Sequence, residues 1–368
     1  MHRFVISGGG TGGHIFPAIA IADGIRARLP DADILFVGAK GRMEMERVPQ
    51  AGYPIKGLYI SGIKRKLSWK NLIFPFKVLY AFWQARQWLR KFKPDVVIGV
   101  GGYASGPTLQ AAISLRIPTL IQEQNSYPGI TNRMLARKTD CICVAYENMQ
   151  SWFPKERTIL TGNPLRLAAV DIHGKKQAAL KFFRLSPEKP VVLVVGGSQG
   201  AWAINRAISQ GLDKLTAQGL QLIWQTGTHY LREARKQIGA IGEHSGIVAW
   251  GFIKRMDMAY AAADIIVSRA GAMAISEMAV VGKPVIFVPL PTAAEDHQAK
   301  NAKRLVARNA AMIVENKDAN EILVPAIISL SQNPEKMQEM ANQIKSFAMP
   351  DAGERIVNEI LKLIPDTA

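Results

Sequence analysis

The residues best suited to chemistry are two glycine turns that could each bind an anionic group. Residues 8–14 read GGGTGGH, and a second turn, GGSQGA, covers residues 196–201. Each turn follows a short apolar run and precedes a segment with helical spacing of apolar residues. Glycine permits positive φ and close approach to a ligand. Because a helix beginning there directs N–H groups and its positive dipole end at the ligand, both turns are predicted to bind phosphate.

The first turn also matches the fingerprint of dinucleotide-binding folds. Gly8, Gly10 and Gly13 have the G-x-G-x-x-G spacing, and such folds place an acidic residue at the end of the next strand. Here the next predicted strand, residues 34–37, runs into Gly-Ala-Lys. NAD is therefore disfavoured, whereas NADP stays open through Arg42.

The second turn also matches the nucleophile elbow of hydrolases. Gly196, Ser198 and Gly200 have the G-x-S-x-G spacing, and Asp264 and His297 follow in the chain order of a catalytic triad. A hydrolase would explain one glycine turn, whereas phosphate binding explains both. We therefore favour two phosphate-binding turns and keep a serine hydrolase as an alternative.

A third group of polar residues follows two later strands. After a predicted strand and a turn at Gly271, a helical segment carries Ser276 and Glu277 in its first turns. A carboxylate there either caps its own helix or accepts hydrogen bonds from two vicinal hydroxyls, as on a ribose. Gln298 lies after the next strand. Since no two histidines have metal-ligand spacing, we predict a site for a nucleotide diphosphate and no metal.

The elements that must position these residues alternate between strand and helix along the whole chain. This pattern predicts an α/β fold with parallel sheets and crossover helices, whose ligands lie beyond the carboxyl ends of the strands. Asp31 and Asp33 precede their strand, so we interpret them as solvated turn residues rather than metal ligands. The predicted strands cover residues 4–7, 34–37, 96–100, 119–122, 141–145 and 158–160, then 191–195, 220–224, 247–249, 265–267, 285–288 and 311–314.

Composition limits the class of protein. A length of 368 residues suits two domains, and a net charge of +17 points to an anionic partner such as nucleic acid, a membrane surface or a phosphorylated substrate. Two cysteines are too few for a disulfide framework or a zinc site. The chain lacks the apolar region of a signal peptide and any run of about 18 uncharged apolar residues, so we expect a cytosolic location.

Residues 60–93 combine aromatic, apolar and basic side chains. As a helix after Pro75, the segment places Phe74, Val78, Phe82, Ala85 and Leu89 on one face and Phe76, Leu79 and Trp83 on another. Only one face can pack on the sheet, so the apolar and aromatic side chains on the other face predict an interfacial membrane patch. A helix buried on two sides is the alternative. Because the aromatic residues gather here rather than along a basic groove, we disfavour binding of nucleic acid.

Seven motifs together resemble the peptidoglycan N-acetylglucosaminyltransferases. They are GGTGGH (9–14), GGYASGP (101–107), EQNSYPG (123–129), TGNPLR (161–166), GGSQGA (196–201), SRAGAMAISE (268–277) and EDHQAKNA (295–302). The resemblance implies a GT-B architecture with two Rossmann-like domains facing a cleft. It implies an acceptor and membrane-associating domain over residues 1–163, a UDP-sugar domain over 164–346, and a terminal helix over 347–368 that returns to the first domain.

The resemblance also implies a reaction. N-acetylglucosamine would pass from UDP-N-acetylglucosamine to the C4 hydroxyl of undecaprenyl-diphospho-N-acetylmuramoyl pentapeptide, with inversion and with neither metal nor cofactor. The enzyme would lie peripherally on the cytoplasmic face of the inner membrane and bind anionic lipid through residues 60–93. A lipid glycosyltransferase that uses diacylglycerol shares this architecture and remains an alternative.

Family motifs assign roles to individual residues. Glu277 would bind the ribose, the backbone near Ile253 the uracil, and Ser198 with the N–H groups of Gln199 and Gly200 the diphosphate. Family members usually have Thr where this chain has Ala274, so a hydroxyl contact is absent there, although backbone N–H groups could serve. The remaining donor residues would be Arg166, Ala272, Met273, Ala274, Ile275, Ser276 and Gln298.

Acceptor and sugar would meet at the first turn, where Thr11, Gly12, Gly13, His14 and Asn125 lie according to the same resemblance. Transfer with inversion needs a base for the incoming hydroxyl. The ordinary pKa of histidine suits proton transfer near neutral pH, so His14 is the candidate base. Binding of phosphate by His14 is the alternative role.

Overall fold

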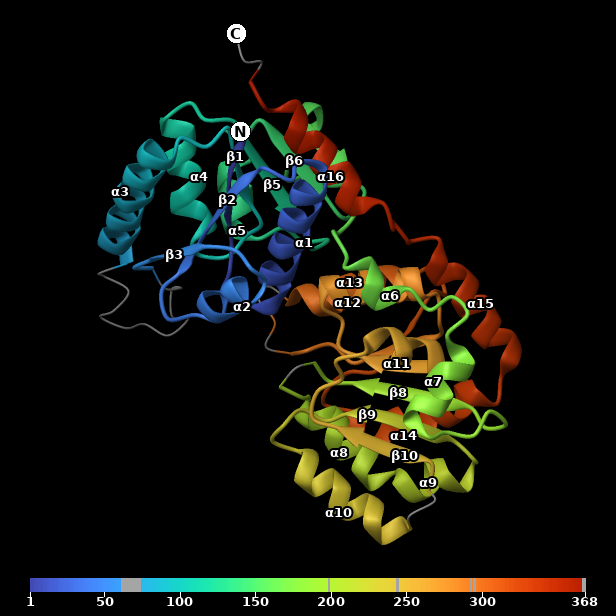
Figure 1. Cartoon of the computed structure of the whole chain (residues 1–368). Helices are drawn as coiled ribbons and strands as arrows, with labels where there is room; N and C mark the ends of the chain where they lie inside the picture. Colours follow the sequence, from blue (N-terminus) through green and yellow to red (C-terminus); the bar gives the residue numbers. More distant parts are fainter. Residues whose placement is uncertain (61–73, 198, 243–244, 292, 294–295, 366–368) are drawn as a thin grey trace. The chain divides into compact units, whose positions relative to one another are not determined.

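The computed structural model describes residues 1–60, 74–197, 199–242, 245–291, 293 and 296–365, and the chain divides into two units. Unit 1 comprises Met1–Leu165 and Met349–Ala368, and unit 2 comprises Arg166–Ala348 (Figure 1). Each unit has its own parallel sheet with helices on both faces. The two-sheet α/β architecture predicted from the sequence is therefore confirmed.

Unit 1 is built on a seven-stranded parallel sheet in the order β3-β2-β1-β4-β5-β6-β7. The sequence analysis predicted all of these strands except β3. This edge strand has four residues, and Lys56 and Gly57 interrupt its apolar pattern. The strands are β1 (Arg3–Ser7), β2 (Asp33–Ala39), β3 (Ile55–Leu58), β4 (Val96–Gly99), β5 (Thr119–Glu123), β6 (Cys141–Val144) and β7 (Thr158–Leu160).

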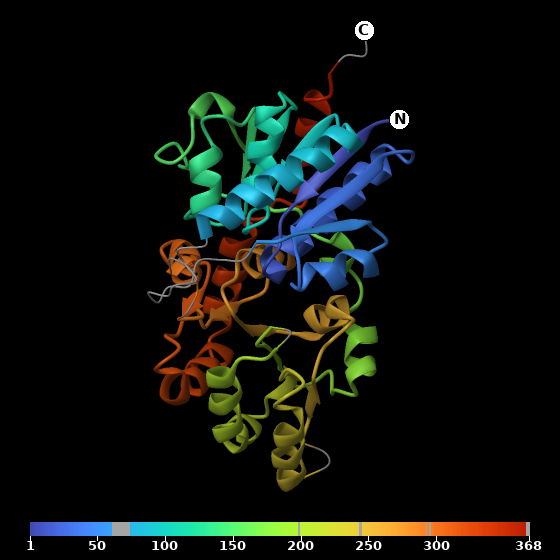
Figure 2. The same ribbon diagram turned by 90° about the vertical axis from the view of Figure 1, so that its left-hand side faces the viewer.

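Helices cover both faces of this sheet (Figures 1 and 2). Alternate strand residues pack on opposite faces, so that Val5 and Val97 contact one helical layer and Phe4 and Ile98 the other. The first layer holds α3 (Phe74–Phe92), α4 (Ser105–Ser114) and α5 (Ile130–Leu135). The second holds α1 (Gly12–Arg28), α2 (Glu44–Gln50) and α16 (Ala352–Lys362), and a 3-10 turn, η2 (Lys155–Arg157), precedes β7.

The last helix belongs to unit 1, although unit 2 precedes it in the chain. Ile356, Val357 and Ile360 of α16 are buried in the same cluster as α1. The side chain of Val357 packs against the backbone of α1, since a Cβ on Gly24 would lie 2.9 Å from a methyl group of Val357. The chain therefore returns to the first sheet after completing the second.

Unit 2 contains a six-stranded parallel sheet in the order β10-β9-β8-β11-β12-β13. All six strands were predicted, with boundaries that differ from the observed ones by at most one residue. Their cores are apolar on both faces, as expected for strands covered by helices on both sides. They are β8 (Val191–Val195), β9 (Gln221–Gln225), β10 (Ile247–Trp250), β11 (Ile265–Ser268), β12 (Val285–Phe287) and β13 (Met312–Ile313).

Two helical layers also cover this sheet. One layer contains α6 (Leu167–Val170), α7 (Lys176–Phe183), α11 (Met256–Ala262), α12 (Ala272–Val281) and α13 (His297–Val306). The other contains α8 (Trp202–Gln210), α9 (Leu212–Ala217), α10 (Leu231–Ile241) and α14 (Ala319–Ser331). The helix α15 (Pro334–Lys345) contributes Ile344 to the first layer and Met340 to the second.

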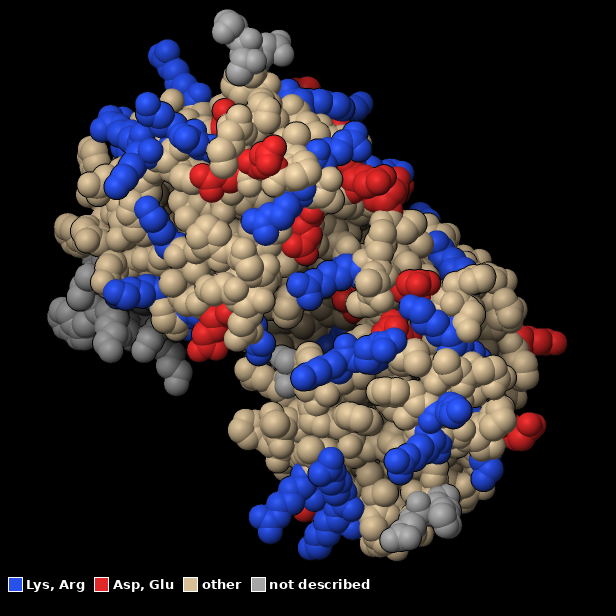
Figure 3. Space-filling view, viewed as in Figure 1, with Lys and Arg blue, Asp and Glu red and all other residues tan. Residues whose placement is uncertain are grey.

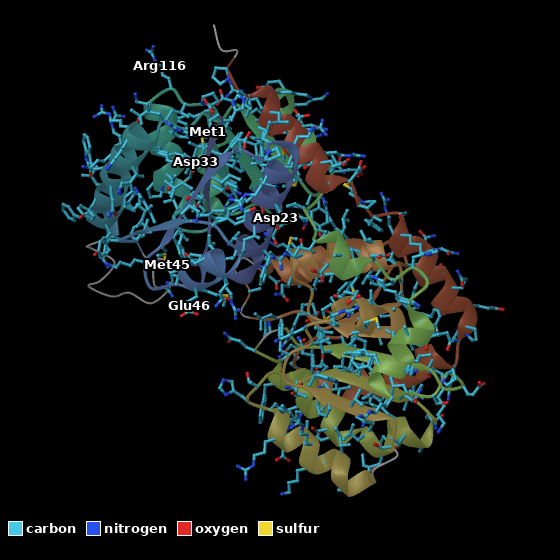
Figure 4. The ribbon with its side chains drawn as sticks, viewed as in Figure 1. Met1, Asp23, Asp33, Met45, Glu46 and Arg116 are labelled. Carbon is cyan, nitrogen blue, oxygen red and sulfur yellow. The ribbon has the colours of Figure 1, made fainter. Side chains whose placement is uncertain are left out.

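In each sheet the strand order reverses at one point, between β1 and β4 in unit 1 and between β8 and β11 in unit 2. Ligands of open parallel sheets bind beyond the carboxyl ends of the strands at such a point. Both glycine turns lie there. Asp33 lies at the opposite end, because it is the first residue of β2 and donates its N–H to the carbonyl of His2, near Met1 (Figure 4).

Candidate functional site

In unit 2, the second glycine turn packs directly on the backbone that follows β9. Gly197 and Gly200 have φ values of +87° and +81°. A Cβ on Gly200 would lie 2.1 Å from the carbonyl oxygen of Thr226, so only glycine fits this contact. The turn leads into α8, whose N-terminus provides N–H groups for an anion. Ser198 lies outside the described residues, and Gln199 is exposed.

A buried glutamine joins this turn to the neighbouring loop. Gln225, the last residue of β9, donates from Nε2 to the carbonyl of Gly197 over 3.1 Å. Its Oε1 accepts the N–H of Ile253 over 2.9 Å. The sequence analysis missed Gln225. Because the N–H of Ile253 is engaged in this bond, a base at this loop would contact the Ile253 carbonyl.

Glu277 lies in the second turn of α12, and its carboxylate is oriented by a tyrosine. The hydroxyl of Tyr260 donates to Oε2 of Glu277 over 2.8 Å. Burial raises the pKa of Glu277 above its usual range, and the bond from Tyr260 acts in the opposite direction. Burial also raises the pKa of Tyr260. This carboxylate is therefore held in a partly desolvated place, where charge-assisted hydrogen bonds are strong.

The other residues predicted to bind the donor lie in α12, in α13 and at the start of α6. Ala272, Met273, Ala274 and Ile275 form the first turn of α12, and the hydroxyl of Ser276 donates to the Ala272 carbonyl. Gln298 is the second residue of α13, and its Oε1 accepts the N–H of Leu290 over 2.9 Å. Arg166 is exposed at the N-cap of α6, which packs against α12.

Arg269 stabilises the loop between β11 and α12, a role that the sequence did not indicate. Its Nη1 donates to the carbonyls of Val288 and Pro289 and to Oδ1 of Asn316. Burial lowers the pKa of Arg269 to about 10, so the group stays charged at neutral pH. A fixed positive charge therefore lies where the chain enters α12.

In unit 1, two glycine turns interlock at the carboxyl ends of β1 and β4. A Cβ on Gly8 would lie 2.2 Å from a methyl group of Val100, and one on Gly102 would lie 2.3 Å from the carbonyl oxygen of Gly9. Gly101 and Gly102 have φ values of +92° and +86°. The backbones of the two turns are therefore in contact, and side chains at these positions would separate them.

Glu44 holds the first turn against β2. It is buried at the start of α2, and its two carboxylate oxygens accept the N–H groups of Gly10 and Ala39, each over 2.9 Å. A Cβ on Gly9 would lie 2.2 Å from this carboxylate. Glu44 thus occupies the Gly10 N–H that a dinucleotide fingerprint would offer to phosphate, which argues against the NADP alternative.

His14 lies in the first turn of α1, and its environment determines its tautomer. Nδ1 is 3.2 Å from the carbonyl oxygen of Gly9 and 3.4 Å from the hydroxyl of Thr11. A carbonyl only accepts, so Nδ1 carries the proton and Nε2 has the basic lone pair. Nε2 lies beside the β4 turn, 2.9 Å from the position of a Cβ on Gly101. Gly12 and Gly13 complete this first turn.

Asn125 is fixed by the buried Glu123 at the end of β5. Glu123 accepts the backbone N–H of Asn125 over 2.9 Å and its Nδ2 over 3.3 Å. It also accepts bonds from Gly129 and Asn132, and burial raises its pKa. The EQNSYPG motif is therefore a loop folded around one carboxylate, which presents Asn125 at the same end of the sheet as His14.

Comparison with known proteins identifies the family. The chain is 53% identical to the UDP-N-acetylglucosamine--N-acetylmuramyl-(pentapeptide) pyrophosphoryl-undecaprenol N-acetylglucosamine transferase of Christiangramia forsetii, over 98% of both chains. It is 50% identical to the transferase of the same name from Parabacteroides distasonis, over 99% of this chain and 98% of the relative. Residues 4–144 match the N-terminal domain of glycosyltransferase family 28, and residues 191–356 match its C-terminal domain. The chain belongs to glycosyltransferase family 28.

A solved structure agrees with this assignment. The crystal structure of MurG from Acinetobacter baumannii is 30% identical to this chain, with a TM-score of 0.81 over 98% of this chain and all of that one. The GT-B architecture expected from the motifs is thus confirmed for this family 28 chain.

The hydrolase alternative is wrong, because the chain belongs to glycosyltransferase family 28 and because Asp264 lies at the end of the sheet opposite to the second glycine turn. Asp264 precedes β11, where its Oδ2 accepts the N–H of Val191 and its Oδ1 pairs with Lys176. It therefore lies beside the first residue of β8, whereas Gly197 of the glycine turn follows the last. Five strand residues span about 17 Å, too far for a hydrogen-bonded triad.

We expect Gly101→Ala to impair this transferase through His14. The new methyl group would lie 2.9 Å from Nε2 and Cδ2 of His14, so the imidazole must move. Displacement of a catalytic group by about 1 Å costs up to about 100-fold in rate. Steady-state kinetics should show kcat reduced at least about tenfold. Gly52→Ala is the matched control, because Gly52 also has positive φ but no atom near its Cβ position. Equal kcat values for the two variants would contradict this prediction.

Proposed function

We propose that the chain transfers N-acetylglucosamine from UDP-N-acetylglucosamine to the C4 hydroxyl of undecaprenyl-diphospho-N-acetylmuramoyl pentapeptide. The observation that carries this proposal is the identity of 53% over nearly the full length of a relative whose name gives the same donor and the same lipid-linked acceptor. The carboxyl ends of the neighbouring strands β8 and β11 support it, because a glycine turn and a helix N-terminus follow β8, and the oriented carboxylate of Glu277 follows β11.

Unit 2 binds the donor nucleotide. Glu277 accepts hydrogen bonds from the vicinal hydroxyls of the ribose, and the uracil contacts the carbonyl of Ile253. The diphosphate lies between the N-termini of α8 and α12, where each helix dipole contributes about 0.3 to 2 kcal/mol. Ser198, Gln199 and Gly200 surround it, and the sugar lies against Gln298. Arg166 and the first turn of α12, from Ala272 to Ser276, complete the site.

Unit 1 supplies the base and binds the acceptor, whose sugar and diphosphate contact Thr11, Gly12, Gly13 and Asn125. Nε2 of His14 takes the proton from the C4 hydroxyl while its oxygen attacks the anomeric carbon in line with the departing phosphate oxygen. The bond to UDP breaks and the configuration inverts. The positive potential of the helix N-termini and Arg166 stabilises the diphosphate as it leaves, so the proposed transfer requires no metal.

Unit 1 also binds the membrane surface, which places the enzyme peripherally on the cytoplasmic face of the inner membrane. On α3, Phe76, Leu79 and Trp83 are 72%, 56% and 56% exposed, whereas Ala85 and Leu89 are buried as the sequence predicted. Lys and Arg side chains gather over this helix (Figure 3). Residues 61–73 of the predicted patch lie outside the described residues. No described helix is long and apolar enough to cross a membrane.

A hollow of about 560 Å³ beside α3 extends this apolar surface. Tyr59, Phe76 and Tyr80 line it together with Lys40 and Lys77. The ammonium group of Lys40 lies 4.3 Å from the centre of the Tyr59 ring. Aromatic rings beside lysines are what an interface with anionic lipid requires.

We expect the triple substitution Phe76→Ser, Leu79→Ser and Trp83→Ser to weaken binding to vesicles containing phosphatidylglycerol. Insertion of each side chain into the membrane surface buries apolar area worth up to about 1.5 to 3 kcal/mol. The affinity for vesicles should therefore fall by more than about tenfold. Vesicle sedimentation measures it. Ile159→Ser with Ile322→Ser, which also removes exposed apolar side chains, should bind as the wild type does. Equal binding by the triple variant would refute the membrane role of α3.

The activity itself is tested by transfer of labelled sugar from UDP-N-acetylglucosamine to a short-chain analogue of the lipid-linked muramoyl pentapeptide. EDTA is present, and UDP-glucose is assayed in parallel. We expect turnover with the first donor only. Transfer to diacylglycerol instead would assign the chain to the alternative lipid glycosyltransferases, and abolition by EDTA would refute metal independence.

A further inference from the structure

We infer that Gln225 is a positioning residue that sets the distance between the phosphate-binding and base-binding parts of the donor site. The inference rests on the donor site proposed above and assigns a role within it to a residue with no assigned ligand contact. The two segments that Gln225 joins, the turn at Gly197 and the loop at Ile253, follow different strands. One amide therefore links the places proposed for diphosphate and uracil.

The chemistry of the two partners determines the orientation of the amide. The Gly197 carbonyl only accepts and the Ile253 N–H only donates, so Nε2 must face the first and Oε1 the second. Gln225 is 3% exposed, and water is therefore poorly placed to replace either bond. A glutamine satisfies both partners at this site, whereas a glutamate would direct an oxygen at the Gly197 carbonyl.

Other bonds hold the surrounding backbone, so a change at Gln225 should act locally. The N–H of Thr226 donates to the Trp250 carbonyl, and Nδ2 of Asn205 donates to the Thr226 carbonyl. These bonds connect the end of β9 to β10 and α8 without Gln225. Its amide thus controls the turn and the loop rather than the sheet.

The same strand provides a matched control. Gln221, the first residue of β9, is also 3% exposed and also bridges backbone groups. Its Oε1 accepts the N–H of Ser186, and its Nε2 donates to the carbonyls of Ser186 and Lys189. These bonds lie at the amino end of the sheet, away from the proposed site. Substitution of Gln221 should therefore reduce stability without changing nucleotide affinity.

The experiment measures Kd for UDP by calorimetry and for uridine by competition, with KM and kcat for UDP-N-acetylglucosamine. The proteins are wild type, Gln225→Glu, Gln225→Leu and Gln221→Glu. Gln225→Glu keeps the acceptor for Ile253 but loses the donor to Gly197, so Kd for UDP should rise about tenfold with little change for uridine. Gln225→Leu should weaken both. KM should rise in parallel while kcat stays within about threefold.

A merely structural glutamine would give a different result. Both Gln225 variants would then lower the melting temperature as Gln221→Glu does and bind UDP and uridine like the wild type, which would overturn the inference while the proposed function stands. Failure of the wild type to bind UDP would instead overturn the donor site and the inference together. If Gln225→Leu does not fold, the near-isosteric Gln225→Glu alone decides between these outcomes.

Discussion

Glu277→Gln should weaken UDP binding by about 100-fold. The carboxylate can accept two charge-assisted hydrogen bonds, each worth about 1.5 to 3 kcal/mol, whereas a carboxamide offers one oxygen and directs an N–H₂ group at the second hydroxyl. Tyr260 already fills one position on Oε2 and so orients the remaining lone pairs. The loss should appear in KM for UDP-N-acetylglucosamine more than in kcat.

Calorimetry with UDP and 2′-deoxy-UDP tests this assignment. Removal of the 2′-hydroxyl should cost the wild type much more affinity than it costs Glu277→Gln, because the variant has already lost the bond. Glu321→Gln, which changes an exposed glutamate in the first turn of α14, should leave both affinities unchanged. A Glu277→Gln enzyme that still distinguishes the two ligands as strongly as the wild type would place the ribose elsewhere.

The pH dependence of binding follows from the same carboxylate. Burial raises the pKa of Glu277 above 4.5, and only the ionised form accepts two hydrogen bonds from the ribose. UDP affinity should therefore fall as the pH decreases through this raised pKa, at a higher pH than for an ordinary glutamate. The contribution of Glu277 to folding stability has the opposite sign, since a buried carboxylate with a raised pKa favours folding at low pH.

The parallel sheets were predictable because their strands carry a direct signal. A run such as Val191–Val195 is apolar at every position, as required when helices cover both faces of a sheet. The strand β3 escaped prediction because its four residues include Lys56 and Gly57 and therefore form no apolar run. The return of α16 to unit 1 cannot be deduced from apolar spacing alone, since an amphipathic helix suits either sheet.

The two glycine turns and Glu277 were the parts of the candidate site that the sequence predicted. Glycine turns after strands appear in sequence as unusual spacing, and a carboxylate after such a turn is conspicuous. Gln225, Glu44 and Tyr260 belong to no motif, because their partners are backbone groups or side chains brought together only by the fold. A polar residue at the end of an apolar strand is the one clue that applies to Gln225.

Some polar residues in or beside the EQNSYPG and TGNPLR motifs stabilise the fold. Gln122, which directly precedes the EQNSYPG motif in β5, donates from Nε2 to Oδ1 of Asn163, and Gln124 of the motif donates to the carbonyl of Val100. Nδ2 of Asn163 in turn donates to the Gln124 carbonyl. All three side chains are buried. The EQNSYPG and TGNPLR motifs are therefore joined by an amide network, and their polarity alone does not indicate ligand binding.

His14→Ala should reduce kcat by about 100- to 10,000-fold, the range expected for loss of a general base. The assignment depends on geometry, because the Gly9 carbonyl holds the proton on Nδ1 and leaves the lone pair on Nε2. Kd for UDP should change little, since unit 2 carries the proposed donor site. His173→Ala, which removes an exposed histidine of unit 2, should retain wild-type kinetics.

The pH profile separates a base from a phosphate ligand. If His14 is the base, the acidic limb of the wild-type kcat profile arises from protonation of Nε2 and should disappear in His14→Ala, where the residual rate no longer depends on that group. If His14 binds the acceptor phosphate instead, the protonated imidazolium is the useful form. His14→Ala would then keep kcat within a few-fold and raise KM for the acceptor, and the wild type would lose acceptor affinity as pH rises. The two roles therefore predict opposite signs of pH dependence from one imidazole.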